Sequence, residues 1–263
     1  MGEQAANTSV AQTVALRKLQ PGDVREAFRL GWRDFRLYPV YGLFFGGIYA
    51  LGGLFITYAL LWLHLPWLVI PVAIGFPLIG PFVAVGLYEV SRRHEAGEAM
   101  SWRAVLTEVF RQRERQMSWM AFVVLFVFWV WIYQVRLLMA LFLGARIPAS
   151  LEGFVSLVIH TPQGLAFLAV GTVVGAVIAA LLFAITVISM PLLLDREIDF
   201  ISAMLHSLRF VTENRAAALG FGMIVAVLAL AALLPGFLGL PVALPFAGHA
   251  TWHLYRKVSP REE

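Results

Sequence analysis

The chain has 263 residues, of which 60% are hydrophobic and 14% are charged. Soluble domains average about 45–50% apolar and about 25% charged residues, so this chain carries more apolar surface than one water-soluble core can bury. The absence of cysteine excludes disulfides, thiolate metal sites and cysteine nucleophiles. The formal net charge of +4 comes from cations in short loops beside apolar segments, a pattern typical of membrane topology signals rather than nucleic-acid binding.

Residues 1–20 contain neither the early cationic cluster nor the apolar core of a secretory signal peptide. We expect them to form a disordered cytoplasmic tail. Residues 21–258 are then expected to form a single membrane domain.

Six segments are long and apolar enough to cross about 30 Å of hydrocarbon as helices. They are residues 40–63, 66–90, 118–143, 164–194, 216–234 and 237–255. Only Pro235 and Gly236 separate the last two segments, which predicts a tight antiparallel hairpin. The sequence therefore predicts an all-α, polytopic fold with six transmembrane helices.

The cations lie at one end of these spans. Of the 20 Lys and Arg residues, only Arg136 and Arg146 lie outside the segment before the first span, the second and fourth loops, and the C-terminal tail. Positive charges in short loops remain in the cytoplasm. Both termini are therefore predicted to be cytoplasmic.

An amphipathic segment precedes each odd-numbered span. In residues 23–38, arginines recur at helical spacing and form one basic face, consisting of Arg25, Arg29, Arg33 and Arg36. Segments 101–115 and 198–213 show the same periodicity. We expect three interfacial helices, with these four arginines contacting lipid headgroups. The helices either lie flat in the headgroup plane or dip back between the spans.

Each even-numbered span contains proline in its middle or cytoplasmic half. These prolines are Pro77, Pro81, Pro191, Pro241 and Pro245. Residues 81–93 align without gaps to 245–257, and residues 27–48 align to 203–224. The pattern favours a threefold repeat of interfacial helix plus kinked hairpin, over about 21–93, 98–197 and 198–257. The alternative is the weak self-similarity that any helical membrane protein shows.

Two GxxxG pairs mark places where helices approach closely. Gly42 and Gly46 lie in the first span, and Gly171 and Gly175 lie in the fourth. Because glycine is common in transmembrane helices, we expect both pairs to serve packing within the chain rather than dimerisation.

Ionisable side chains in or near a membrane are costly, and they mark candidate substrate or ion pathways. The candidates here are Glu89, Asp195, His249 and His253. For Glu89 we favour pairing with Arg92 or Arg93, and for Asp195 a salt-bridge network at headgroup level. The two histidines share one helix face because they lie four residues apart. Since the sequence offers no third ligand at a compelling spacing, we expect no metal and no cofactor.

Arg136 lies near the outer end of the third span. One interpretation is that its side chain reaches outward to lipid headgroups. The other is an ion pair with Glu152, which would fix residues 151–160 as an interfacial or re-entrant helix. The sequence favours the first.

Five blocks of sequence, at 34–53, 75–93, 132–142, 191–204 and 244–257, carry a family resemblance. They resemble an uncharacterised bacterial integral-membrane family, domain-of-unknown-function family 2189. The likeness spans about residues 25–258. It implies a multi-pass protein of the bacterial inner membrane with no established activity or ligand.

These observations predict a non-enzymatic membrane protein, because no hydrolase, kinase or phosphate-binding motif is recognisable in the sequence. We expect an accessory, scaffold or assembly component of a membrane complex. Its partners would be membrane lipids and other membrane proteins, not nucleic acid. The alternative is a small-solute transporter or channel, with Glu89, Asp195 and His249 along its path.

Overall fold

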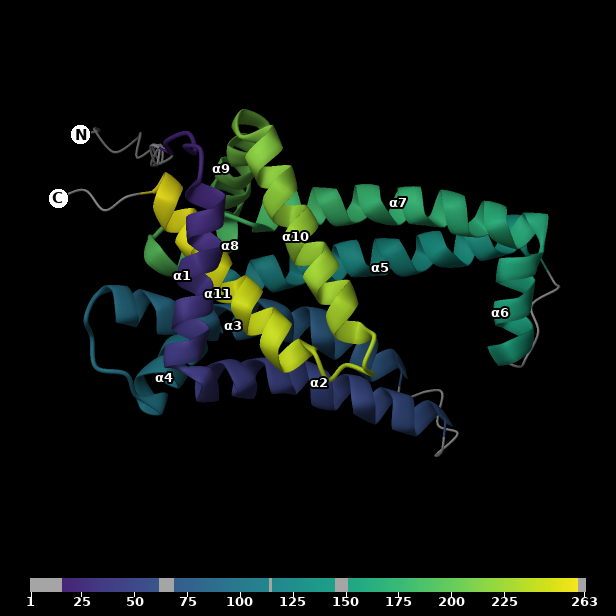
Figure 1. Ribbon diagram of the computed structural model, residues 1–263, viewed down its shortest axis with the longest axis horizontal. Coiled ribbons are helices and arrows are strands. Elements are labelled where there is room, and N and C mark those ends of the chain that lie inside the picture. The colour runs from purple at the N-terminus through teal and green to yellow at the C-terminus, as the bar shows by residue number, and fades with distance from the viewer. Residues whose placement is uncertain (1–15, 62–68, 114, 145–150, 260–263) are drawn as a thin grey trace, which may run out of the picture. The chain divides into compact units, whose positions relative to one another are not determined.

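The computed structural model describes residues 16–61, 69–113, 115–144 and 151–259. Every regular element in these ranges is a helix (Figure 1), which confirms the predicted all-α class. The helices are α1 (Asp23–Leu37), α2 (Pro39–Leu61), α3 (Val69–Glu95), α4 (Trp102–Arg113), α5 (Met117–Phe142), α6 (Leu151–His160), α7 (Pro162–Thr186), α8 (Ser189–Asp195), α9 (Phe200–Glu213), α10 (Arg215–Leu233) and α11 (Leu240–Val258).

The chain divides into two compact units. The first comprises residues 1–121 and 185–263, and the second comprises residues 122–184. The first unit therefore brings together the two ends of the chain and holds eight of the described helices in whole, α1–α4 and α8–α11. The predicted single domain of three repeat units stays a prediction. Residues 1–15 of the predicted tail lie outside the described residues.

Four helical segments within the described residues are long and apolar enough to cross a membrane. They are Pro39–Tyr58, Met117–Phe142, Pro162–Asp195 and Arg215–Leu233. They correspond to the first, third, fourth and fifth predicted spans. The second and sixth, residues 66–90 and 237–255, are not confirmed, although α3 and α11 are continuous helices over most of these segments.

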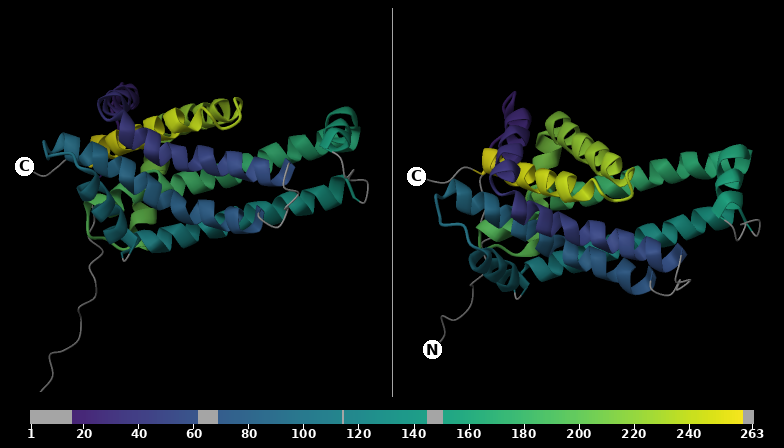
Figure 2. Two further views of the ribbon diagram at one scale, coloured as in Figure 1. Left: turned by 90° about the horizontal axis from the view of Figure 1, so that it is seen from below. Right: turned by 60° about the horizontal axis from the view of Figure 1, so that its bottom comes forward.

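The three predicted amphipathic segments are helices with nearly the expected bounds, namely α1, α4 and α9. The apolar face of α4 packs on protein, because Val105 is buried in a cluster with Phe45 and Leu87. Figure 2 shows α2 and α3 running side by side. Much of the apolar surface of α4 is therefore covered by its own chain rather than by lipid.

α11 is extensively buried within the first unit. It packs against α1, α2, α3 and α10, and Figure 1 shows α1 lying along it. The contact with α1 is close because Gly31 has no side chain: a Cβ there would lie 2.6 Å from the backbone nitrogen of Ala250. This separation is far below van der Waals contact, so glycine at residue 31 is what allows the two helices to meet.

The glycines of α2 serve contacts within the chain, as expected. A Cβ on Gly46 would lie 2.8 Å from the Cα of Pro241, and one on Gly42 would lie 3.1 Å from Pro245. Pro245 is itself buried inside α11. Its ring removes a backbone hydrogen bond, and the notch left by the α2 glycines accommodates it.

The glycines of α7 face α5 within the second unit. Cβ positions on Gly171 and Gly175 would lie 3.9 Å from Leu138 Cδ1 and 3.8 Å from Trp131 Nε1. These distances are ordinary van der Waals contacts. The second GxxxG pair therefore also packs within the chain.

Two corners of the first unit have the same backbone geometry. Tyr38 joins α1 to α2 with φ −127° and ψ 52°, and Asn214 joins α9 to α10 with φ −122° and ψ 38°. The backbone N–H groups of Tyr38 and Asn214 donate to the carbonyl oxygens of Asp34 and Phe210. These residues are aligned with one another in the match of 27–48 to 203–224.

The connection before α11 is longer than predicted, because residues 234–239, and not Pro235 and Gly236 alone, join α10 to α11. Between α10 and α11 the backbone has positive φ at Gly236 (61°) and Phe237 (69°). The N–H of Gly239 donates to the carbonyl of Ala232 at 3.2 Å. The two helices therefore form the expected hairpin.

Candidate functional site

The two candidate histidines of α11 lie in a buried polar group that we call the Asp34 cluster, comprising Asp34, Ser91, His249 and His253. The N–H at Nε2 of His253 donates to Asp34 Oδ2 at 2.7 Å, and a 2.8 Å hydrogen bond joins Ser91 Oγ to His249 Nδ1. Asp34, Ser91 and His249 have no exposed surface, and His253 is 5% exposed. The cluster therefore ties together α1, α3 and α11.

The environment of Asp34 keeps its carboxylate ionised. Burial raises the pKa of Asp34, but the hydrogen bond and charge of His253 outweigh it, with help from Ser91, so the pKa lies below its ordinary value. Arg33 Nη2 lies 3.1 Å from Oδ1 of the same carboxylate, and His94 Nε2 lies 3.9 Å from it. Several donors and positive charges thus compensate for removing this charge from water.

One polar atom of the cluster has no partner. His249 Nε2 is buried and makes no hydrogen bond within the described part of the chain. Buried polar atoms without partners are uncommon in folded proteins. His249 therefore differs from the other three members of the cluster in having a buried ring nitrogen without a hydrogen-bond partner among the described residues.

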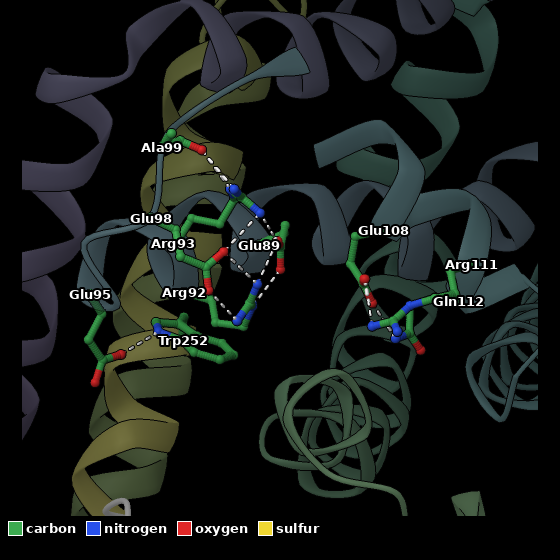
Figure 3. Close-up of polar contacts among 10 residues, drawn as sticks. All are labelled: Glu89, Arg92, Arg93, Glu95, Glu98, Ala99, Glu108, Arg111, Gln112 and Trp252. Carbon is green, nitrogen blue, oxygen red and sulfur yellow. Dashed lines mark hydrogen bonds and ion pairs between the residues drawn. The ribbon is translucent and has the colours of Figure 1, made fainter. Parts of the chain in front are cut away.

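Glu89 lies six residues before the C-terminal end of α3 in a second group, the arginine cluster, comprising Glu89, Arg92, Arg93 and Glu98. Arg92 donates to both carboxylate oxygens of Glu89, at 2.7 and 2.9 Å, and Arg93 Nη1 lies 3.4 Å from one of them. Figure 3 shows both guanidinium groups directed at this carboxylate. The predicted pairing of Glu89 with its neighbouring arginines is confirmed.

Asp195 lies in a third polar group, at the end of α8. Its Oδ2 accepts a hydrogen bond from the hydroxyl of Tyr255 at 2.6 Å. The guanidiniums of Arg256 and Arg196 lie 3.7 and 3.9 Å from the same oxygen. Nearby, Arg115 donates to Glu197 at 2.9 Å. This is the salt-bridge network expected from the sequence.

The remaining predicted residues are distributed over both units. Pro81 and Pro191 are buried, like Pro245. Among the basic residues of α1, Arg29 pairs with Glu26 at 2.6 Å, Arg33 is the neighbour of Asp34 described above, and Arg25 and Arg36 are exposed. Their contact with lipid headgroups stays a prediction.

Arg136 and Glu152 belong to the second unit. Both are exposed, and the described residues include no ion pair between them. Residues 151–160 nevertheless form a helix, α6. The favoured interpretation, an arginine reaching the outer headgroups, stays a prediction.

Sequence reasoning missed Asp34 and Ser91. A signal for Asp34 existed: it lies three residues after Gly31 and seven after Ala27, so it falls on the same helix face as these two buried residues. A carboxylate inside an apolar stripe predicts a buried partner. Ser91 offered no such signal, because a serine beside two arginines is unremarkable at a helix end.

The described residues include no group of three or more His, Asp or Glu side chains placed to hold a metal ion. The two histidines of α11 point to different partners, Asp34 and Ser91. The contacts observed in the cluster are hydrogen bonds between side chains of the protein.

Comparison with known proteins agrees with the membrane character of the chain. A family model described as "Predicted integral membrane protein (DUF2189)" matches residues 68–195, which run from the start of α3 to the end of α8. Neither the curated proteins nor the solved structures include a significant match. The predicted resemblance to this family of predicted integral membrane proteins of unknown function is confirmed over residues 68–195, a shorter stretch than the expected 25–258.

Proposed function

We propose that this protein is a non-enzymatic accessory, scaffold or assembly component of a membrane complex. One observation carries the proposal. Glu89, Asp195 and His253, three of the four candidates for a transport path, each bind side chains of the same chain at 2.6–2.7 Å. Groups whose hydrogen bonds are already made within the chain stabilise its structure, whereas a transport path needs groups that can release their partners.

The proposed topology has six spans, including α3 and α11, and places both termini in the cytoplasm of a bacterial cell, with the protein in the inner membrane. The asymmetric distribution of cations supports it. The matching corners at Tyr38 and Asn214 support the proposed internal repeat.

The natural absence of cysteine makes this topology directly testable. We would introduce single cysteines as Ala96→Cys and Leu234→Cys, both at exposed positions, and append one after Glu263. A membrane-impermeant maleimide added to intact spheroplasts should label only Leu234→Cys. The other two should react only after permeabilisation. Labelling of the C-terminal cysteine in intact spheroplasts would show that α11 does not cross the membrane.

The test of function is purification from native membranes in a mild detergent, followed by mass spectrometry. A stoichiometric protein partner is expected. Elution of the protein alone, with only lipid or a small molecule bound, would overturn the accessory-component proposal.

The second candidate function is transport of a small solute. The unpartnered Nε2 of His249, close to the ionised Asp34, favours it, because a group with a free lone pair or proton can exchange with a bound species. Glu89→Gln and His249→Gln should then reduce solute flux. Unchanged flux or growth in both variants would exclude a path through these residues.

A further inference from the structure

A hollow of about 350 Å³ lies between the end of α3 and the start of α4. Three arginines line it: Arg92 and Arg93 from α3, and Arg103 from α4. The hydroxyl groups of Ser101 and Thr107 add hydrogen-bonding groups to the same wall. Guanidinium and hydroxyl donors converging on one space are the chemistry that binds phosphate.

Two carboxylates also line the hollow, and each is already neutralised. Glu89 is held by Arg92 and Arg93, as Figure 3 shows. Glu108, on the other wall, accepts from Gln112 at 2.7 Å and pairs with Arg111 at 2.7 Å. These carboxylates therefore hold the walls in place and leave a positive charge uncompensated.

That uncompensated charge is Arg103. It makes no hydrogen bond or ion pair within the described ranges, and it is exposed beside the hollow. Ser101 Oγ accepts the backbone N–H of Ala104 at 3.2 Å, so its own O–H can still donate. The start of α4 adds the positive end of a helix dipole. Donors for an anion are thus available without breaking an existing pair.

The aromatic neighbours of the hollow indicate its depth in the membrane. Trp102, between Ser101 and Arg103, stacks on Tyr41 with ring centroids 4.1 Å apart and meets Phe44 edge-on at 5.2 Å. Trp and Tyr concentrate at the headgroup level of membranes. The hollow therefore opens where phospholipid phosphates lie.

We propose that this hollow binds a phosphate group, carried by the headgroup of an anionic phospholipid. Arg103 and the Ser101 hydroxyl contact the phosphate oxygens, while Arg92 and Arg93, whose charges are balanced by Glu89 and Glu98, form the α3 side of the hollow. The same donor set would accept inorganic phosphate, so the test includes both. The proposal is independent of whether the protein serves as an accessory component or a transporter.

The test uses the full chain in mild detergent, titrated with phosphatidylglycerol, with phosphatidylcholine or with inorganic phosphate, and native mass spectrometry reports bound lipid. Arg103→Gln should weaken phosphatidylglycerol binding about tenfold, the usual effect of losing one charge-assisted contact. Arg215→Gln is the matched control, because it removes an exposed arginine at the start of α10 that does not line the hollow, and it should change binding less than twofold.

The other outcomes are decisive. Equal losses in Arg103→Gln and Arg215→Gln would overturn the proposal, because they would indicate general attraction of the lipid to exposed arginines. If the wild type retained phosphatidylcholine as strongly as phosphatidylglycerol, the proposal would be overturned as well. Millimolar inorganic phosphate could also displace the lipid from the wild type but not affect Arg103→Gln. That result would support the phosphate site and show that it accepts a soluble anion as well as a lipid headgroup. Size-exclusion profiles check that each variant remains folded.

Discussion

α1 and α9 are amphipathic helices that lead through the same backbone corner into a long apolar helix, yet they use their apolar faces differently. In α1 the stripe containing Gly31 and Phe35 is buried, and Gly31 abuts α11. In α9 the apolar side chains of Ile201, Leu205 and Leu208, which lie on one face of the helix, are exposed at 54%, 61% and 40%. An amphipathic pattern thus identifies a face but does not say whether protein or lipid covers it.

The buried sides of the two helices differ at one aligned position. Asp34 in α1 corresponds to Phe210 in α9, and both are at most 1% exposed. Phe210 is held by shape and apolar contact alone. Asp34 needs a polar partner from a distant part of the chain, and His253 provides it. At this aligned position, α9 is therefore stabilised by the packing of Phe210, whereas α1 is stabilised by the polar pair of Asp34 and His253.

The largest expected effect comes from removing either buried side chain. Asp34→Ala leaves His253 without its acceptor and should cost about 3–5 kcal/mol, and Phe210→Ala should cost a similar amount by leaving a cavity. Thermal unfolding in detergent, followed by tryptophan fluorescence, measures both. If Asp34→Ala lost less than about 1 kcal/mol, the polar pair would not be what holds α1 on α11.

A smaller effect is expected where α1 meets α11. Gly31→Ala should destabilise by about 1–3 kcal/mol, since its Cβ would overlap the backbone at Ala250. Gly47→Ala is the matched control, because its Cβ would have no neighbour within 4 Å. That control should be neutral or gain up to about 1 kcal/mol from helix propensity. Equal results for the two variants would contradict the close approach of these helices.

The pH dependence of stability distinguishes the two aligned positions. Because the pKa of Asp34 is lowered on folding, its contribution is present above its unfolded pKa of about 3.8 and is lost as the pH falls through the lower folded value. Melting temperatures of the wild type should therefore fall more steeply below about pH 4 than those of Asp34→Asn. Phe210→Ala should retain the steep wild-type dependence. Parallel curves for wild type and Asp34→Asn would contradict this.

The smallest effect is expected on the exposed face of α9. Leu205→Ser should change stability in detergent by less than about 0.5 kcal/mol, because the side chain contacts little protein. Liposome reconstitution should reveal a weaker membrane association of this helix, measured as greater protease access. A large loss of stability in detergent would mean that protein, not lipid, covers this face.

Hydropathy and helical spacing were sufficient for much of the fold. The amphipathic helices α1, α4 and α9 begin and end within a few residues of prediction, and four of the predicted spans meet the length and apolarity of a membrane helix. The ion pairs of Glu89 with Arg92 and Arg93 were also predictable, because these partners lie three and four residues away on the same helix. Such features depend on near neighbours in sequence.

The Asp34 cluster was not predictable in the same way. His253 and Asp34 are 219 residues apart, and Ser91 and His249 are 158 apart. The Gly31 contact with Ala250 depends equally on distant segments. Local periodicity indicates that a face is apolar, but it does not indicate which helix will cover it.

The sequence by itself determined the helical class, the membrane character and the asymmetry of charge, because these follow from composition and from spacings of a few residues. Only the tertiary structure decided that α11 lies enclosed among α1, α2 and α3, that Asp34 is buried against His253, and that Arg103 completes a basic hollow. The physical reason is that burial and pairing belong to two segments at once, and their energies exist only after the chain has brought those segments together.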